Sequence, residues 1–240
     1  MLLFALLLGV AQASDACSYS STVSTDVGLL LSTSPEPLSQ ENVEGAATAS
    51  ETSTDQAETP EKPAPLWEDF PYFYQYNNAL HKGSSCQNTS VAMVLQHYGV
   101  DVSPDDITRR FGKDLAQSPE GLARVFNTYA SEAGIEQRIT AHRDGSMADL
   151  DALLEEGKPV ILHGYFTSYG HVVVALGKTD EGYVVNDPAG AWTERFRGGY
   201  TGGTATNGEA VVYDGSSFRK AVGTSNGATP LPLWYHEITP

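Results

Sequence analysis

The stretch that decides the fold is Gly170-His171-Val172-Val173-Val174-Ala175-Leu176-Gly177, which leads through Thr179-Asp180-Glu181-Gly182 into Tyr183-Val184-Val185-Asn186-Asp187-Pro188. Two apolar runs separated by a short Gly- and Asp-containing turn predict an antiparallel hairpin. If the turn lies at residues 179–182, the numbers of paired residues sum to about 359 or 360. His171 then lies opposite residue 188 or 189, within two residues of Asp187. The hairpin therefore brings a carboxylate into range of an imidazole.

The residues before Pro159 predict helices, and those after it predict strands on both sides of this hairpin. The first helix is indicated by its run of apolar residues, and the others by a serine at the N-cap position. In two of these, a proline follows the serine at the first helical position. The expected helices span 87–98 or begin at Ser103-Pro104, Ser118-Pro119 and Ser146. Further strands are expected at 160–162, 211–213 and 234–238. This order predicts an α+β fold class, with N-terminal helices packed on a C-terminal antiparallel β-sheet.

Cys86 stands at the start of the first expected helix, directly after Gly83-Ser84-Ser85. A thiol attacks as the thiolate, which a helix N-terminus and a nearby imidazolium both stabilise. The alternative is a small buried hydrophobic residue, a common role for cysteine. Because His171 has a carboxylate on its own hairpin, we predict Cys86 as nucleophile, His171 as base and Asp187 as its orienter. Asn186 is the rival for the third position.

The other histidines have weaker claims to the base. His163 lies on the preceding strand with no acid near it in sequence, and His97 lies about 16 Å along the helix from Cys86 at 1.5 Å per residue. His81, His142 and His236 fall in expected loops or near the chain end. No Cys and His spacing is typical of a metal site, and no phosphate-binding loop is present. We therefore expect no metal and no cofactor.

The acidic charge is concentrated in the first quarter of the chain. The formal net charge is −16, and residues 14–65 contribute −8 of it, from nine acids and one base. Such a balance argues against nucleic-acid binding, which requires a basic surface. Residues 14–65 are rich in Ser, Thr, Glu and Pro and lack periodic apolar positions, which predicts a disordered acidic tether. Residues 66–240 are expected to form the globular domain.

Residues 1–13 form a short apolar run ending in Ala11-Gln12-Ala13, which is typical of a signal peptide. We therefore expect a secreted or cell-envelope protein. The rival is a lipoprotein anchored through Cys17, although the preceding Ser14-Asp15-Ala16 fits a lipidation site poorly. Cys17 and Cys86 are the two cysteines of the chain. A disulfide between them would join the tether to the domain, but a domain of this size does not require one.

The motifs, in their order and spacing, resemble the peptidase C39-like family. They are Pro71-Tyr72-Phe73-Tyr74-Gln75-Tyr76, the run from Ser85 to Leu95, Gly157-Lys158-Pro159-Val160, Gly170 to Val174 and Asn186 to Gly190. The resemblance covers residues 66–240 and implies a papain-like cysteine peptidase fold. It places Cys86, His171 and Asp187 in the catalytic roles above and Gln75 at the oxyanion hole. Gln75 lies 11 residues before Cys86, farther than in the leader peptidases of the family, because residues 77–85 form an insertion.

The resemblance implies a bacterial cysteine peptidase acting on a peptide or peptide-like substrate. We further expect a monomer that is associated with the cell envelope. Hydrolysis of an amide bond through a Cys86 thioester is the first hypothesis. No transporter segments follow, so leader processing during export is not expected. A papain-like acyltransferase and a non-catalytic peptide- or cell-wall-binding module remain open. A third alternative assigns the interaction to the tether.

Composition predicts where proteases cut. Light proteolysis of the whole chain should remove residues 17–65 and leave a stable core beginning near Leu66, because a segment with little apolar surface cannot offset the entropy of ordering. Mass spectrometry of the resistant fragment locates its first residue. Strong amide-exchange protection within residues 17–65 would contradict this prediction.

Overall fold

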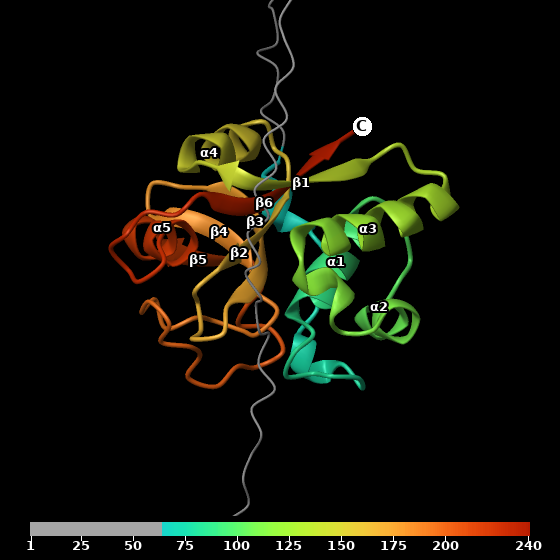
Figure 1. Ribbon diagram of the computed structural model, residues 1–240, viewed down its shortest axis with the longest axis horizontal. Coiled ribbons are helices and arrows are strands. Elements are labelled where there is room, and N and C mark those ends of the chain that lie inside the picture. The colour runs from blue at the N-terminus through green and yellow to red at the C-terminus, as the bar shows by residue number, and fades with distance from the viewer. Residues whose placement is uncertain (1–63) are drawn as a thin grey trace, which may run out of the picture. The chain divides into compact units, whose positions relative to one another are not determined.

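The computed structural model describes residues 64–240 (Figure 1). The predicted signal peptide and nearly all of the predicted tether lie outside these residues. The helices are α1 (Cys86–His97), α2 (Pro104–Phe111), α3 (Pro119–Ala133), α4 (Met147–Glu155) and α5 (Gly215–Gly223). The strands are β1 (Arg138–Gly145), β2 (Val160–Gly164), β3 (His171–Lys178), β4 (Gly182–Asn186), β5 (Val211–Asp214) and β6 (Leu233–Thr239). Short 3-10 helices lie at Leu66–Glu68, Gln75–Asn77 and Leu115–Gln117.

The strands form one six-stranded sheet in the order β1-β6-β2-β3-β4-β5, and neighbouring strands pair antiparallel. The predicted hairpin is β3 and β4. Val174 pairs with Asn186 and Ala175 pairs with Val185. The numbers of paired residues therefore sum to 360 in the part of the hairpin near His171, as predicted. Beyond an irregularity at Leu176, Gly177 pairs with Val184 and the sum becomes 361.

Helices cover both faces of this sheet (Figure 1). Val172, Val174 and Leu176 of β3 join the core formed with α1 and α3. Val173 and Ala175 face the second core, formed with α4 and α5. This alternation follows from the two-residue period of a strand, and it requires apolar residues at successive positions of a strand buried on both faces. The predicted α+β fold class is confirmed.

The helix starts predicted from serine are confirmed. The Ser103 side chain accepts a hydrogen bond from the backbone N–H of Asp106, and the Ser146 side chain accepts one from that of Asp149. Each aspartate side chain accepts in return from the backbone N–H of its serine, which completes a capping box. Ser118 accepts from the N–H of Gly121 at 3.1 Å. α1 begins at Cys86, one residue before the predicted span.

The sequence did not predict β1 or α5. β1 has a single buried residue, Ile139, so it carries no apolar alternation to detect. Its outer edge is held by Asn127 of α3, whose amide accepts from the Ile139 N–H at 2.8 Å and donates to the Ile139 carbonyl at 2.9 Å. α5 begins with Gly215 and two serines, and its one signal is Asp214, which caps the Ser217 N–H at 2.8 Å.

None of the helices within residues 64–240 is long and apolar enough to cross a bilayer.

The Asn127 contact yields a stability prediction. Asn127→Ala leaves both backbone groups of Ile139 without their side-chain partner and should lower the free energy of unfolding by about 1–3 kcal/mol. Urea denaturation measures this difference. Thr128→Ala is the matched control, because the Thr128 hydroxyl donates only to the Arg124 carbonyl of its own helix. Equal losses in the two variants would show that Asn127 does not secure the edge of the sheet.

Candidate functional site

Cys86 is the first residue of α1 and is fully buried. The next residue fixes this end of the helix to the surrounding loops. Gln87 is also fully buried, and its Nε2 donates to the carbonyls of Ser84 at 3.1 Å and Lys113 at 2.6 Å. Its Oε1 lies 3.3 Å from the Cys86 sulfur. The N-terminus of α1, where unpaired N–H groups favour negative charge, is therefore held in one position.

The same helix is bonded to the strand that begins with His171. One turn after Cys86, the Ser90 hydroxyl donates to the Val172 carbonyl at 3.2 Å. Val172 follows His171 directly, so this bond fixes the first turn of α1 against the first residues of β3. α1 and β3 share the core described above. The fold thus brings the segment carrying Cys86 to the segment carrying His171.

His171 and Asp187 form a direct buried pair, as the hairpin predicts. His171 Nε2 lies 2.8 Å from Asp187 Oδ1, with 4% of His171 and none of Asp187 exposed. An ionised carboxylate only accepts hydrogen bonds, so Nε2 carries the proton in this pair. The neutral ring then has its lone pair on Nδ1. This tautomer gives His171 an atom that can accept a proton.

Asp187 is aimed by the turn that follows β4. Its N–H donates to the Gly208 carbonyl at 2.8 Å, and its Oδ1 accepts from the Ala189 N–H at 2.9 Å. A side chain that bonds the backbone two residues on is a common turn device of aspartate. The rival Asn186 points elsewhere: its amide donates to the Pro71 carbonyl at 3.1 Å and accepts from the Ala210 N–H at 2.8 Å.

Gln75 is buried in the short helix Gln75–Asn77. Its backbone N–H donates to the Pro188 carbonyl at 2.8 Å, which places it beside the Asp187 turn. Its Nε2 donates to the Lys82 carbonyl at 3.0 Å, while its Oε1 is buried without a hydrogen-bond partner. Nε2 has a second proton. The inserted segment is itself anchored, because Asn78 donates to Ser85 and Thr89 at 2.9 and 3.0 Å.

His163 lies close to His171 but in a different environment. Its ring is tilted against Trp234 at 5.7 Å and edge-on to Tyr165 at 6.2 Å. Burial, with smaller electrostatic contributions from the neighbouring His171 and His236, lowers the pKa of His163 to about 4. His163 is therefore neutral at pH 7. His97 stacks on Phe70 at the far end of α1.

Two tyrosines at the site were not predicted from the sequence. The hydroxyls of Tyr200 and Tyr213 both donate to Asp187 Oδ2 at 2.8 Å. Tyr213 lies in the strand expected at 211–213, so its position on a strand beside β4 was the one signal that could have found it. Tyr200 belongs to a Gly- and Thr-rich loop with no periodicity that could have placed it.

Cys86 is disulfide-bonded in this structure. The chain's other cysteine, Cys17, lies outside the described residues. A disulfide sulfur is not a nucleophile, so chemistry at Cys86 requires reduction to the thiol. Within residues 64–240, no three His, Cys, Asp or Glu side chains gather closely enough to hold a metal ion.

Several solved structures are similar to this chain at low identity. A protein described as a C39-like peptidase from Bacillus anthracis is 16% identical with a TM-score of 0.43, covering 57% of this chain and 91% of that chain. A double glycine motif protease from an AMS/PCAT transporter, in complex with the leader peptide, is 23% identical with a TM-score of 0.36, covering 55% and 86%. The peptidase domain of Streptococcus ComA, a bi-functional ABC transporter, is 19% identical with a TM-score of 0.36, covering 50% and 87%. No curated protein matches.

The family comparison covers most of the described domain. A family model described as the Peptidase_C39 like family matches residues 67–219. This span contains each of the predicted site residues, Gln75, Cys86, His171 and Asp187. The resemblance predicted from the sequence is confirmed, and with it the papain-like α+β fold class. The chain belongs to the Peptidase_C39 like family.

Proposed function

We propose that this protein is a cysteine hydrolase that cleaves a peptide or other amide bond through a thioester at Cys86. His171 is the general base and Asp187 orients it. The observation that carries the proposal is the buried hydrogen bond of 2.8 Å between His171 and Asp187. His171 begins β3, and the helix that starts with Cys86 is hydrogen-bonded to this strand. The proposal needs the reduced form of Cys86.

The first half of the reaction forms the thioester. His171 Nδ1 takes the thiol proton, which gives a thiolate and an imidazolium. The thiolate attacks the carbonyl carbon, and the carbon–nitrogen bond breaks as His171 returns the proton to the leaving amine. Asp187 accepts from Nε2 throughout, which keeps the imidazole in the useful tautomer and stabilises the imidazolium.

The oxyanion of the tetrahedral intermediate is stabilised at the start of α1. The backbone N–H of Cys86 and the second Nε2 proton of Gln75 are the proposed donors, as in the family. The support for Gln75 is its bond to the Pro188 carbonyl, which keeps it beside the Asp187 turn. In the second half, water loses a proton to His171 and attacks the thioester, which releases the acid and restores the thiol.

Exposed aromatic side chains support a peptide-like substrate. Tyr76 follows Gln75 and is 44% exposed, and Tyr169 precedes Gly170-His171 and is 52% exposed. Tyrosine is enriched at surfaces that bind another protein, because its ring is apolar and its hydroxyl can form a hydrogen bond. The apolar run at residues 1–13 supports a location outside the cytoplasm, secreted or at the cell envelope.

Turnover of a peptide library tests the proposal. After mild reduction, the wild-type chain should cleave members of the library, and Cys86→Ala should not. His171→Ala should lower kcat by about 10²- to 10⁴-fold, the usual contribution of an acid–base group. His163→Ala is the matched control on the neighbouring strand. A loss from His163→Ala as large as that from His171→Ala, with folding intact, would mean that His163 is the base. Cleavage that yields only transfer to added amines would indicate an acyltransferase.

A thiolate–imidazolium pair also predicts fast alkylation at low pH. After reduction, Cys86 should react rapidly with iodoacetamide at pH 6, where an ordinary thiol, with a pKa of about 8.5, is almost fully protonated. His171→Ala should restore the ordinary dependence on pH, because the stabilising cation is lost. Cys17 is the internal control, since its sequence neighbours include no histidine. Peptide mapping gives the rate at each cysteine. If Cys86 reacts no faster than Cys17 at pH 6, the binding-module alternative replaces the enzyme.

A further inference from the structure

The Asp187 carboxylate accepts from several donors, of which His171 is only one. Oδ1 accepts from His171 Nε2 at 2.8 Å and from the Ala189 N–H at 2.9 Å. Oδ2 accepts from the hydroxyls of Tyr200 and Tyr213, each at 2.8 Å. A carboxylate offers about four lone-pair positions. These contacts therefore use the full accepting capacity of this buried group.

We propose that Tyr200 and Tyr213 are positioning residues, which fix Asp187 Oδ2 and thereby keep Oδ1 directed at the His171 ring. The inference rests on the proposed function, because the orientation of His171 matters for catalysis only if His171 is the base. A carboxylate held through Oδ1 alone can rotate about the bond between its β and γ carbons. Two donors on Oδ2, from two separate segments, oppose this rotation. The pair is then oriented before substrate binds.

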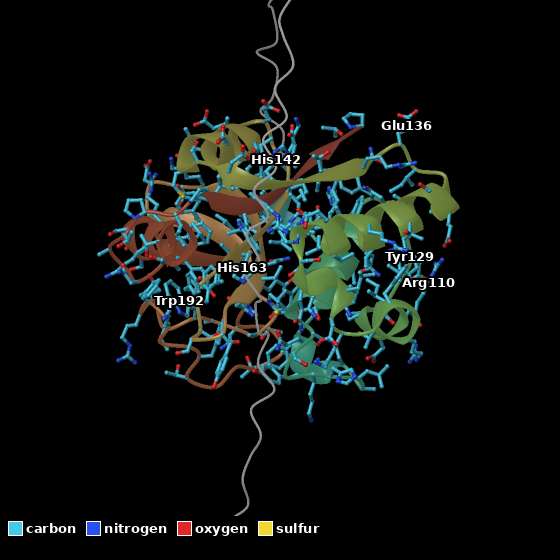
Figure 2. All side chains as sticks on the ribbon, in the orientation of Figure 1. Arg110, Tyr129, Glu136, His142, His163 and Trp192 are labelled. Carbon is cyan, nitrogen blue, oxygen red and sulfur yellow. The ribbon has the colours of Figure 1, made fainter. Side chains whose placement is uncertain are left out.

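Tyr213 supplies the rigid half of this arrangement. It lies on β5 and is 1% exposed, and its ring is edge-on to the ring of Trp192, with centroids 5.6 Å apart. Trp192 is labelled in Figure 2. Its hydroxyl accepts from the Trp192 N–H at 2.9 Å and lies 3.3 Å from the Gly190 carbonyl. The hydroxyl has one proton, and the charged Asp187, at the shorter distance, is the stronger acceptor. Donation from Trp192 further polarises this O–H group.

Tyr200 supplies the half that approaches from the surface. It is half-buried and lies in the loop between β4 and β5, where it forms an isolated β-bridge with Trp192. Its ring is edge-on to the His171 ring, with centroids 5.4 Å apart. Tyr200 therefore contacts both members of the pair, through its hydroxyl on Asp187 and its ring against His171.

Both hydroxyls remain donors over the pH range of a peptidase assay. Burial raises the pKa of Tyr200 well above 10, and the negative charge of Asp187 raises it further. The same two causes, in the same order, raise the pKa of Tyr213. A tyrosine whose pKa is raised stays neutral up to a higher pH. Neither tyrosine therefore loses its proton below pH 10, and neither hydrogen bond to Asp187 is lost by titration there.

The sheet contains a matched tyrosine away from the site. Tyr183 pairs directly with Tyr213 across β4 and β5. It is also buried, and its hydroxyl donates to Asp151 Oδ1 at 2.7 Å. Tyr183→Phe and Tyr213→Phe therefore remove the same atom from adjacent positions of the sheet, and only Tyr213 reaches Asp187. A general effect on the stability of the sheet would appear in both variants.

Kinetics of the full, reduced chain test the proposal. Tyr200→Phe and Tyr213→Phe should each lower kcat by about 10- to 100-fold, the contribution of one hydrogen bond to a charged group, with KM unchanged. Tyr183→Phe should keep the wild-type kcat. In an Asp187→Ala background, neither tyrosine substitution should lower kcat further, because the group that they position is absent. Thermal unfolding confirms that each variant is folded. If Tyr213→Phe does not fold, the half-buried Tyr200→Phe decides.

A second measurement needs no substrate. The Nε2 proton of His171, assigned by its loss in His171→Ala, should give a sharp NMR signal in the wild type and in Tyr183→Phe. The signal should broaden in Tyr200→Phe and Tyr213→Phe, because the hydrogen bond to Asp187 becomes mobile. If the wild type cleaves peptides but both substitutions leave kcat and the signal unchanged, the positioning role is wrong while the hydrolase stands. If no peptide is cleaved, the proposed function fails, and the signal alone decides the positioning role.

Discussion

Asp187 carries a negative charge into the interior of the protein, and the arrangement of the surrounding segments provides its stabilisation. A buried charge is costly unless it is paired and hydrogen-bonded. The donors come from β3, from the turn after β4, from the loop before β5 and from β5 itself. All of them are N–H or O–H groups, which suits an ionised carboxylate that can only accept. The sheet holds these segments in register, so it serves as the scaffold of the site.

The backbone of the Asp187 turn is held as closely as its side chain. The Tyr72 hydroxyl donates to the Asp187 carbonyl at 2.9 Å, and the Gln75 N–H donates to the Pro188 carbonyl at 2.8 Å. The Gly- and Thr-rich loop between β4 and β5 also packs against this turn. A Cβ added at Gly208 would lie 2.2 Å from the Asp187 carbonyl oxygen. Glycine is therefore required at this close approach of two backbones. This contact is the physical reason for a glycine in a loop whose composition alone indicated no role.

Features written locally in the sequence were predictable, and those that depend on distant contacts were not. The serine caps at Ser103, Ser118 and Ser146 act within one helical turn, so they located three helices. The β3–β4 hairpin closes over a short turn, so counting residues from that turn was enough to place Asp187 beside His171. β1 was not predicted, because the hydrogen bonds at its outer edge come from the side chain of Asn127, which lies in α3. The tyrosines on Asp187 escaped because Tyr200 and Tyr213 reach it across 13 and 26 residues.

The long sequence separations within the site have a consequence for synthesis of the chain. A ribosome releases the polypeptide from its N-terminus, and domains organise as their contacts become available. Cys86 emerges early, His171 and Asp187 follow, and Tyr213 emerges later still. The Tyr72 bond to Asp187 spans 115 residues, so the N-terminal part of the site also waits for the C-terminal half. A nascent chain therefore exposes its sulfur well before it has an ordered imidazole–carboxylate pair, and the complete site forms only after Tyr213 has been synthesised.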